Sequence, residues 1–144
     1  MNTVTIYTDG SAPQNSQGHG KGGYCAILVS GEHEKVVSGH EEDTTNNRME
    51  MRAVIEGLSA LKRRCKVTVV SDSEYVVKGV TEWMPHWDVN RGMKRNKPLK
   101  NADLWAKLHL LTLEHDIQWE WVRGHNGHEY NQRCDEIARR ESGV

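Results

Sequence analysis

Acidic side chains follow directly on two β-rich segments of the sequence, a position from which a carboxylate can bind a metal ion. Residues 3–8 show the period-two alternation of a strand and end at Asp9, and the apolar run 66–71 ends at Asp72. Ligands of open α/β sheets bind beyond the carboxyl ends of the strands, so neighbouring strands would bring these two acids together. An Asp after a strand is also a common turn residue or helix cap, and this alternative holds for each acid taken alone.

Two more carboxylates lie on predicted helices. Apolar residues follow Glu50 at four, eight and eleven positions, so Glu50 lies on the buried stripe of a helix predicted over about residues 47–64. Asp135 lies on a small and polar face of a helix predicted over residues 131–140, which could meet the same place. The alternatives are that Glu50 is a first-turn acid stabilised by the helix dipole and that Asp135 is a solvated surface acid.

A bound cation would explain all of these acids together. Carboxylates a few ångströms apart cannot all stay ionised unless the pKa of some is raised or a cation lies between them. Ligation by oxygen alone favours Mg²⁺ or Mn²⁺ over zinc. Such a site suits phosphoryl transfer, in which two metal ions about 3.5–4 Å apart stabilise the attacking and the leaving oxygen. The sequence therefore predicts a divalent-metal site formed by Asp9, Glu50, Asp72 and Asp135.

A candidate proton carrier precedes the last predicted helix. His125 lies in the Gly-containing segment 123–128, where it could approach a reacting group and move away. A hydrogen bond that stabilises the loop is an alternative role for this histidine. A zinc site is another alternative, which Cys134, the only thiol near this segment in the sequence, supports weakly.

The segment 91–100, which we call the basic protrusion, contains five cations and no acid. It could track a phosphate backbone, and the aromatic pair before it, Trp83 and Trp87, could stack on bases. The alternatives are a solvated face for the charges and the hydrophobic core for the tryptophans. The cations are Arg91, Lys94, Arg95, Lys97 and Lys100.

The elements that position these residues alternate between β and α patterns. Three strands, over residues 3–8, 24–30 and 35–40, form a predicted antiparallel meander. The helix that follows has Thr45 as its N-cap, and because it crosses over to the strand 66–71, that strand should lie parallel to one of the first three. The remaining predicted elements are a helix over residues 73–84, a helix capped by Asn101, a strand over residues 117–122 and the helix that carries Asp135.

Composition excludes several classes of protein. The 144 residues suit one domain, 1–144, and a mean hydropathy of -0.75 with 27% charged residues is typical of a globular chain. No segment approaches the ~20 apolar residues that span a bilayer, and the start of the chain lacks the pattern of a secretory signal. Because the three cysteines are odd in number and far apart, we expect reduced thiols in a cytoplasmic protein.

The ordered set of motifs in this sequence resembles a bacterial-type ribonuclease H of type 1. No single motif is decisive, but together they cover nearly the whole chain. They are YTDGS at 7–11, TTNNRME at 44–50, SDS at 71–73, KNADLW at 100–105, WEWV at 119–122, GH at 124–125 and RCD at 133–135.

The resemblance implies an α/β fold, ribonuclease H-like, with a five-stranded mixed sheet flanked by helices. It implies that the four acids bind two Mg²⁺ ions, for which Mn²⁺ could substitute, and that His125 is the mobile histidine of the catalytic loop. The basic protrusion would bind an RNA–DNA hybrid, and Glu74 stands in a substrate-contacting position where relatives commonly carry Gln. Further nucleic-acid contacts are implied for Asn15, Thr45, Asn46, Asn47 and Asn101.

The resemblance also implies a function: hydrolysis of the RNA strand of RNA–DNA hybrids, leaving 3′-hydroxyl and 5′-phosphate ends. We expect a monomer with no membrane partner. One alternative is a hybrid-binding module without catalytic activity, which would bind in a salt-dependent way without metal-dependent cleavage. The other is a phosphotransferase, because sugar-kinase and actin-like domains have a similar fold and also place an early Asp beside a Gly-rich turn.

Overall fold

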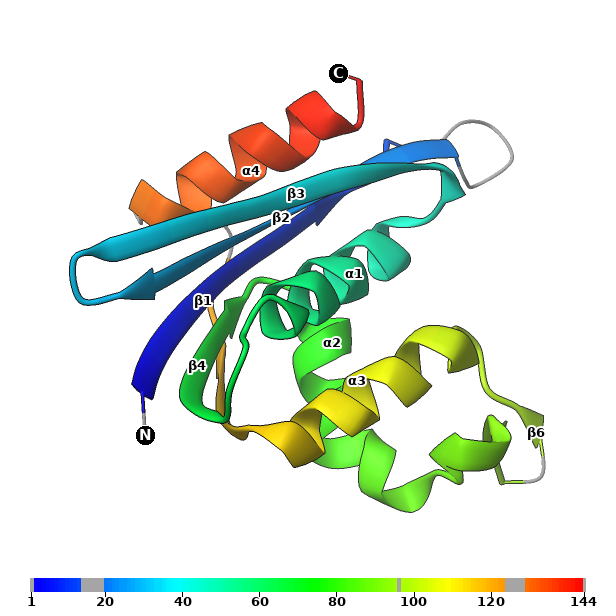
Figure 1. Ribbon diagram of the computed structural model, residues 1–144. Helices are drawn as coiled ribbons and strands as arrows, with labels where there is room; N and C mark the ends of the chain where they lie inside the picture. The colour runs from blue at the N-terminus through cyan, green and yellow to red at the C-terminus, as the bar shows by residue number, and fades with distance from the viewer. Residues whose placement is uncertain (1, 14–19, 96, 124–128, 144) are drawn as a thin grey trace.

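The computed structural model describes residues 2–13, 20–95, 97–123 and 129–143. Its main feature is a five-stranded sheet in the order β3-β2-β1-β4-β7 (Figure 1). The strands of this sheet are β1 (Asn2–Ser11), β2 (Gly20–Ser30), β3 (His33–Thr44), β4 (Cys65–Ser71) and β7 (Asp116–Trp121). The helices are α1 (Asn46–Ser59), α2 (Glu74–Lys78), α3 (Ala102–Glu114) and α4 (Glu129–Glu141), and a small hairpin contains β5 (Met93–Lys94) and β6 (Lys97–Pro98).

The sheet is mixed, as predicted. β1 pairs antiparallel with β2, and β2 with β3, which confirms the meander of the first three strands. β4 lies parallel to β1 and to β7. This confirms the prediction that the strand after α1 is parallel to one of the first three strands. Because β1 and β4 are parallel neighbours, their carboxyl ends lie at the same edge of the sheet.

Helices cover both faces of the sheet (Figure 1). α1 packs on one face and α4 on the other, over β1, β2 and β3 in both cases. The alternation along β2 explains this arrangement, because Ala26 and Leu28 belong to the core under α1 whereas Cys25 and Ile27 pack with Cys134 of α4. Cys25, Cys65 and Cys134 are free and buried, as predicted.

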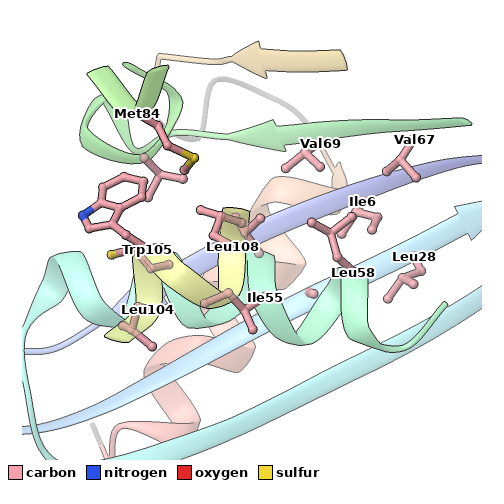
Figure 2. Close-up of a cluster of buried hydrophobic side chains, with 14 of the residues drawn as sticks. Ile6, Leu28, Ile55, Leu58, Val67, Val69, Met84, Leu104, Trp105 and Leu108 are labelled. Carbon is pink, nitrogen blue, oxygen red and sulfur yellow. The ribbon is translucent and has the colours of Figure 1, made fainter. Parts of the chain in front are cut away.

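The larger core lies between the sheet and α1, and it continues to α3 (Figure 2). Ile6, Leu58 and Val69 lie at its sheet end, and Figure 2 shows Leu104, Trp105 and Met84 at its other end, with Leu108 between the two groups. α3 packs mainly against α1 rather than on the sheet. The helix α1 therefore has the sheet on one side and α3 on the other, which explains why eight of its residues are buried.

Some predicted boundaries were wrong. The helix predicted over residues 47–64 ends at Ser59, where Leu61 N–H bonds to the Leu58 carbonyl at 3.2 Å in a tightened last turn. Leu61 still packs against the core, so the helical periodicity continued past the end of the helix. β4 begins at Cys65, which pairs with Asn2 at the start of β1. Residues 60–64 turn the chain back from the end of α1 to this position, so the helix cannot continue through them.

The predicted helix over residues 73–84 is helical but not uniform. The α-helical residues end at Lys78, a π-helical turn covers Gly79–Trp83, and a 3₁₀ turn covers Met84–His86. Gly79 is needed at this turn, because a Cβ there would lie 2.1 Å from the Trp105 ring. The wider turn and the missing side chain together let Trp105 reach the core.

Candidate metal centre and nucleic-acid interface

Three of the predicted acids converge at the carboxyl edge of β1 and β4. Asp9, Glu50 and Asp72 each offer one carboxylate oxygen, and these oxygens all lie within 4.8 Å of one another. We call these three residues the acidic trio. Asp9 comes from β1, Glu50 from the first turns of α1, and Asp72 follows β4 directly. Segments more than 60 residues apart in the sequence thus form one site.

Local backbone contacts bring the three elements together. Thr45 caps α1, as predicted, by accepting a hydrogen bond from the Arg48 N–H at 3.3 Å. A Cβ on Gly10 would lie 2.4 Å from the Glu50 backbone nitrogen, so only glycine lets β1 come this close to α1. This approach places the Glu50 carboxylate on the buried face of α1, beside Asp9.

The turn that carries Asp72 is held by the end of β7 and by the residue that follows it. The Val122 N–H donates to the Ser71 carbonyl at 2.9 Å, and the Trp121 indole N–H donates to the Asp72 carbonyl at 3.2 Å. Ser71 in turn accepts from the Ser73 N–H at 3.0 Å through its hydroxyl. Our sequence analysis missed Trp121, because its place beside Asp72 depends on the register of β4 against β7.

The acidic trio is electrostatically unfavourable without a cation. Burial, followed by the charges of Asp72 and Asp135, raises the pKa of Asp9 to about 8. Burial and the charges of Asp9 and Asp72 raise the pKa of Glu50 well above its ordinary value. Asp9 Oδ2 and Glu50 Oε1 are buried and accept no hydrogen bond from the described residues. A cation with a preference for oxygen ligands fits this set of atoms.

Asp135 lies next to the acidic trio but not within it. Its charge and a side-chain hydrogen bond raise the pKa of Asp9, so its carboxylate lies beside Asp9. Asp135 Oδ2 also pairs with Arg139 Nη2 at 3.0 Å. The neighbouring Cys134 Sγ lies 3.1 Å from the Cys25 carbonyl oxygen and 3.4 Å from that of Tyr7, which fixes α4 against β1 and β2 at this point.

The basic protrusion lies on the surface. All five of its cations are exposed, and it contains the β5–β6 hairpin, whose strands pair Lys94 with Lys97. Trp83 has 37% of its surface exposed and Trp87 is half-buried, so the tryptophans are shared between surface and core. The two rings, with His86, Lys94 and Arg95, line a surface pocket that an aromatic or phosphate group could enter.

The other predicted contact residues have defined positions. Asn46 Oδ1 accepts from the Ala12 N–H at 3.0 Å, and Asn47 is exposed at the start of α1. Glu74 is exposed and pairs with Lys78 at 2.8 Å, so it does not enter the acidic trio. Asn101 precedes α3, but its side chain makes no capping hydrogen bond, which corrects the predicted cap. Asn15 and His125 lie outside the described residues.

The mixed sheet with an acidic trio at its parallel edge defines the class of ribonuclease H-like metal-dependent nucleases. The family model for RNase H matches residues 1–143. The ribonuclease H of Cupriavidus necator is 55% identical over 97% of this chain and 95% of its own length, and that of Hahella chejuensis is 51% identical over 96% and 92%. The chain therefore belongs to the ribonuclease H family.

Solved structures agree with this assignment. LC9-RNase H1, a type 1 enzyme with the type 2 active-site motif, is 29% identical with a TM-score of 0.87 over 99% of this chain and 72% of that one. LC11-RNase H1 in complex with an RNA/DNA hybrid shares the fold, at 23% identity and a TM-score of 0.66 over 97% and 96%. Ribonucleases H are metal-dependent endoribonucleases that cleave the RNA strand of RNA–DNA hybrids, so the predicted fold and enzyme class are confirmed.

Proposed function

We propose that this chain hydrolyses internal phosphodiester bonds of the RNA strand with Mg²⁺ held by Asp9, Glu50 and Asp72, and with Asp135 as a fourth ligand. The observation that carries this proposal is the convergence of the acidic trio, with oxygens within 4.8 Å of one another. Two of these carboxylates are buried, and each keeps an oxygen without a hydrogen-bond donor among the described residues. Such oxygens are ready to bind a cation.

The donor set favours Mg²⁺, with Mn²⁺ as a substitute. Its ligands are carboxylate oxygens, which suit hard divalent cations, whereas zinc sites usually contain nitrogen or sulfur ligands. When bound, two Mg²⁺ ions supply an activated water and stabilise the oxygen that leaves as the 3′-hydroxyl. Asp135, already paired with Arg139, lies where it can change partner as metal and substrate bind. We assign His125 the transfer of a proton or the release of product.

The substrate would extend from the acidic trio to the basic protrusion. Exposed lysines and arginines bind the phosphate backbone of any duplex, so this surface supplies affinity rather than sequence preference. Thr45, Asn46 and Asn47 lie at the start of α1, Asn101 lies just before α3 and bonds to Arg48 of α1, and all four offer neutral groups to phosphates and 2′-hydroxyls. We place the bound hybrid along this path.

Cleavage of labelled substrates tests the proposal directly. We expect the RNA strand of a hybrid to shorten with Mg²⁺ and to stay intact with chelator, while duplex DNA and single strands persist. Asp9→Asn should abolish cleavage, whereas Asp116→Asn, which removes an exposed acid at the start of β7, should not. Salt-dependent binding without cleavage would favour a binding module, and ATP binding without any effect on polynucleotides would favour a phosphotransferase.

The chain should act as a monomer and as a single domain in the cytoplasm. One chain supplies the whole acidic trio, so no second subunit is needed to complete it. The three buried free thiols suit a reducing compartment. In the described part of the chain, no helix has the length and apolar character that would let it cross a membrane. Sedimentation of the active protein tests the monomer.

A further inference from the structure

The carboxylate of Asp135 lies between two regions of opposite charge. On one side is the acidic trio, because the charge of Asp135 and a side-chain hydrogen bond act on Asp9, which makes the two carboxylates neighbours. On the other side, Asp135 Oδ2 lies 3.0 Å from Nη2 of Arg139. The side chain of Asp135 is 17% exposed and that of Arg139 is 59% exposed. Arg139 therefore brings a positive charge from the surface of α4 to the rim of the acidic site.

The packing of α4 fixes where this contact forms. Residues four apart lie one turn apart on the same side of a helix, and side chains lean toward its N-terminus, so Arg139 reaches back to Asp135. Cys134 Sγ lies 3.1 Å from a carbonyl oxygen of β2, and a Cβ on Gly23 of β2 would lie 2.2 Å from the Ala138 carbonyl oxygen. The sheet therefore holds α4 closely on both sides of this turn, and the rotation of the helix sets the direction of Asp135.

The ion pair matters more for metal binding than for folding. Pairs that are largely exposed contribute little to stability. A cation that enters the site finds an oxygen of Asp9 and one of Glu50 that accept no hydrogen bond from the described residues. At Asp135 the same cation competes with a guanidinium that already occupies Oδ2. A guanidinium stays charged at every pH at which the enzyme could work, so protonation does not relieve this competition.

We propose that Arg139 is a positioning residue that holds the Asp135 carboxylate in the metal-free protein and thereby weakens the binding of Mg²⁺. This inference rests on the proposed function, in which Asp135 is the fourth ligand, and adds a residue that acts through it. Asp135 has to leave Arg139 before it can join the acidic trio as a ligand. Arg139 therefore sets the Mg²⁺ concentration at which the complete set of four carboxylates binds metal.

Calorimetric titration of the substrate-free protein with Mg²⁺ tests this role. We expect Arg139→Gln to lower the Kd about fivefold, the strength of a good exposed ion pair written as a ratio, and Arg139→Lys to return it toward the wild-type value. Damage to the fold would weaken binding instead. Arg140→Gln is the matched control, because it removes the same charge from the next exposed residue of α4, four positions after Glu136 rather than Asp135. A Kd that is unchanged or higher in Arg139→Gln, or that falls equally in the control, overturns the proposal.

A double-mutant comparison tests the route through Asp135. Asp135→Asn should weaken Mg²⁺ binding, and adding Arg139→Gln to it should leave the Kd unchanged, because no ion pair then has to break. Direct repulsion between Arg139 and the metal would instead lower the Kd in both backgrounds, and that result contradicts the proposal. The same titrations separate this inference from the proposed function. If Asp135→Asn binds Mg²⁺ as tightly as the wild type, the fourth ligand of the proposed function is refuted, whereas weaker binding by Asp135→Asn with no effect of Arg139→Gln refutes the inference alone.

Discussion

Replacing Asp9 by Asn should make the metal-free protein more stable while it abolishes cleavage. Asp9 is 4% exposed, and its pKa is raised from an ordinary value of 3.8 to about 8 by burial and by Asp72 and Asp135. Each increase of one in a pKa corresponds to about 1.4 kcal/mol. Above pH 8, keeping Asp9 ionised therefore lowers the stability of the folded protein by about 6 kcal/mol. Water entry and small shifts of the carboxylates reduce this value, and we expect Asp9→Asn to recover about 3 kcal/mol at pH 8.

The pH dependence has a defined sign. The folded protein holds the Asp9 proton more tightly than the unfolded chain does, so this group weakens folding progressively as pH rises from 3.8 to about 8. Above that range the unfavourable contribution is complete, and below it there is none. The advantage of Asp9→Asn should therefore fall to about 1 kcal/mol at pH 5.

Urea unfolding in chelator, followed by circular dichroism at pH 5 and pH 8, measures both effects. For a chain of this size, 3 kcal/mol should raise Tm by about 6–12 °C. Saturating Mg²⁺ should stabilise the wild type by about 3 kcal/mol at a hundred times its Kd, and the variant much less. Asp116→Asn, the exposed control, should stay within about 0.5 kcal/mol of wild type. A less stable Asp9→Asn at pH 8, or equal stabilisation of both proteins by Mg²⁺, would refute the reasoning.

The basic protrusion should set the salt dependence of substrate binding: Lys94→Ala with Lys97→Ala should weaken hybrid binding and lower the slope of log K against log salt by about 2, as a salt titration of Kd would show. Trp121→Phe removes the indole N–H that holds the Asp72 carbonyl, and we expect the Mg²⁺ concentration for half-maximal stabilisation to rise about threefold or more in a thermal titration. Gly79→Ala should destabilise the protein by about 2–3 kcal/mol in urea, since the new Cβ would collide with Trp105. An unchanged salt slope, Mg²⁺ midpoint or urea midpoint would contradict the respective prediction.

Much of the site could be predicted from the sequence because short patterns position its residues. Asp9 and Asp72 follow the patterns of two strands, and Glu50 lies on the apolar stripe of α1. Strand and helix periodicity is therefore enough to predict that the three acids meet at one edge of the sheet. The cap at Thr45 is equally local, since its hydroxyl bonds three residues along the chain. The ordered motifs then predicted the fold and the enzyme class.

The contacts that the sequence did not reveal depend on register or on tertiary approach. Trp121 lies beside Asp72 because β7 pairs with β4 residue by residue, and no local pattern fixes that pairing. Asn101 was predicted as a helix cap from its type, but Arg48 and Tyr75 use its side chain instead. The end of α1 at Ser59 follows from the return of the chain to β4, which periodicity does not detect.

Backbone contacts, rather than the carboxylates themselves, hold the acidic trio in place. Gly10 brings β1 against α1, and hydrogen bonds from Trp121, the last residue of β7, and from Val122, which follows it, hold the turn at Asp72. Variants that remove charge should therefore keep the geometry, whereas Gly10→Ala would change the geometry and keep the charge, because its Cβ would lie 2.4 Å from the Glu50 nitrogen. Both Gly10→Ala and Asp9→Asn should lose cleavage.

Their stabilities should move in opposite directions. Gly10→Ala should destabilise the metal-free protein by about 2–3 kcal/mol through steric overlap, while Asp9→Asn stabilises it. Urea unfolding of the two variants in chelator measures this contrast. If both variants were destabilised alike, the carboxylates would be part of what holds the site together, and repulsion between their charges could not be the main source of instability in the metal-free protein.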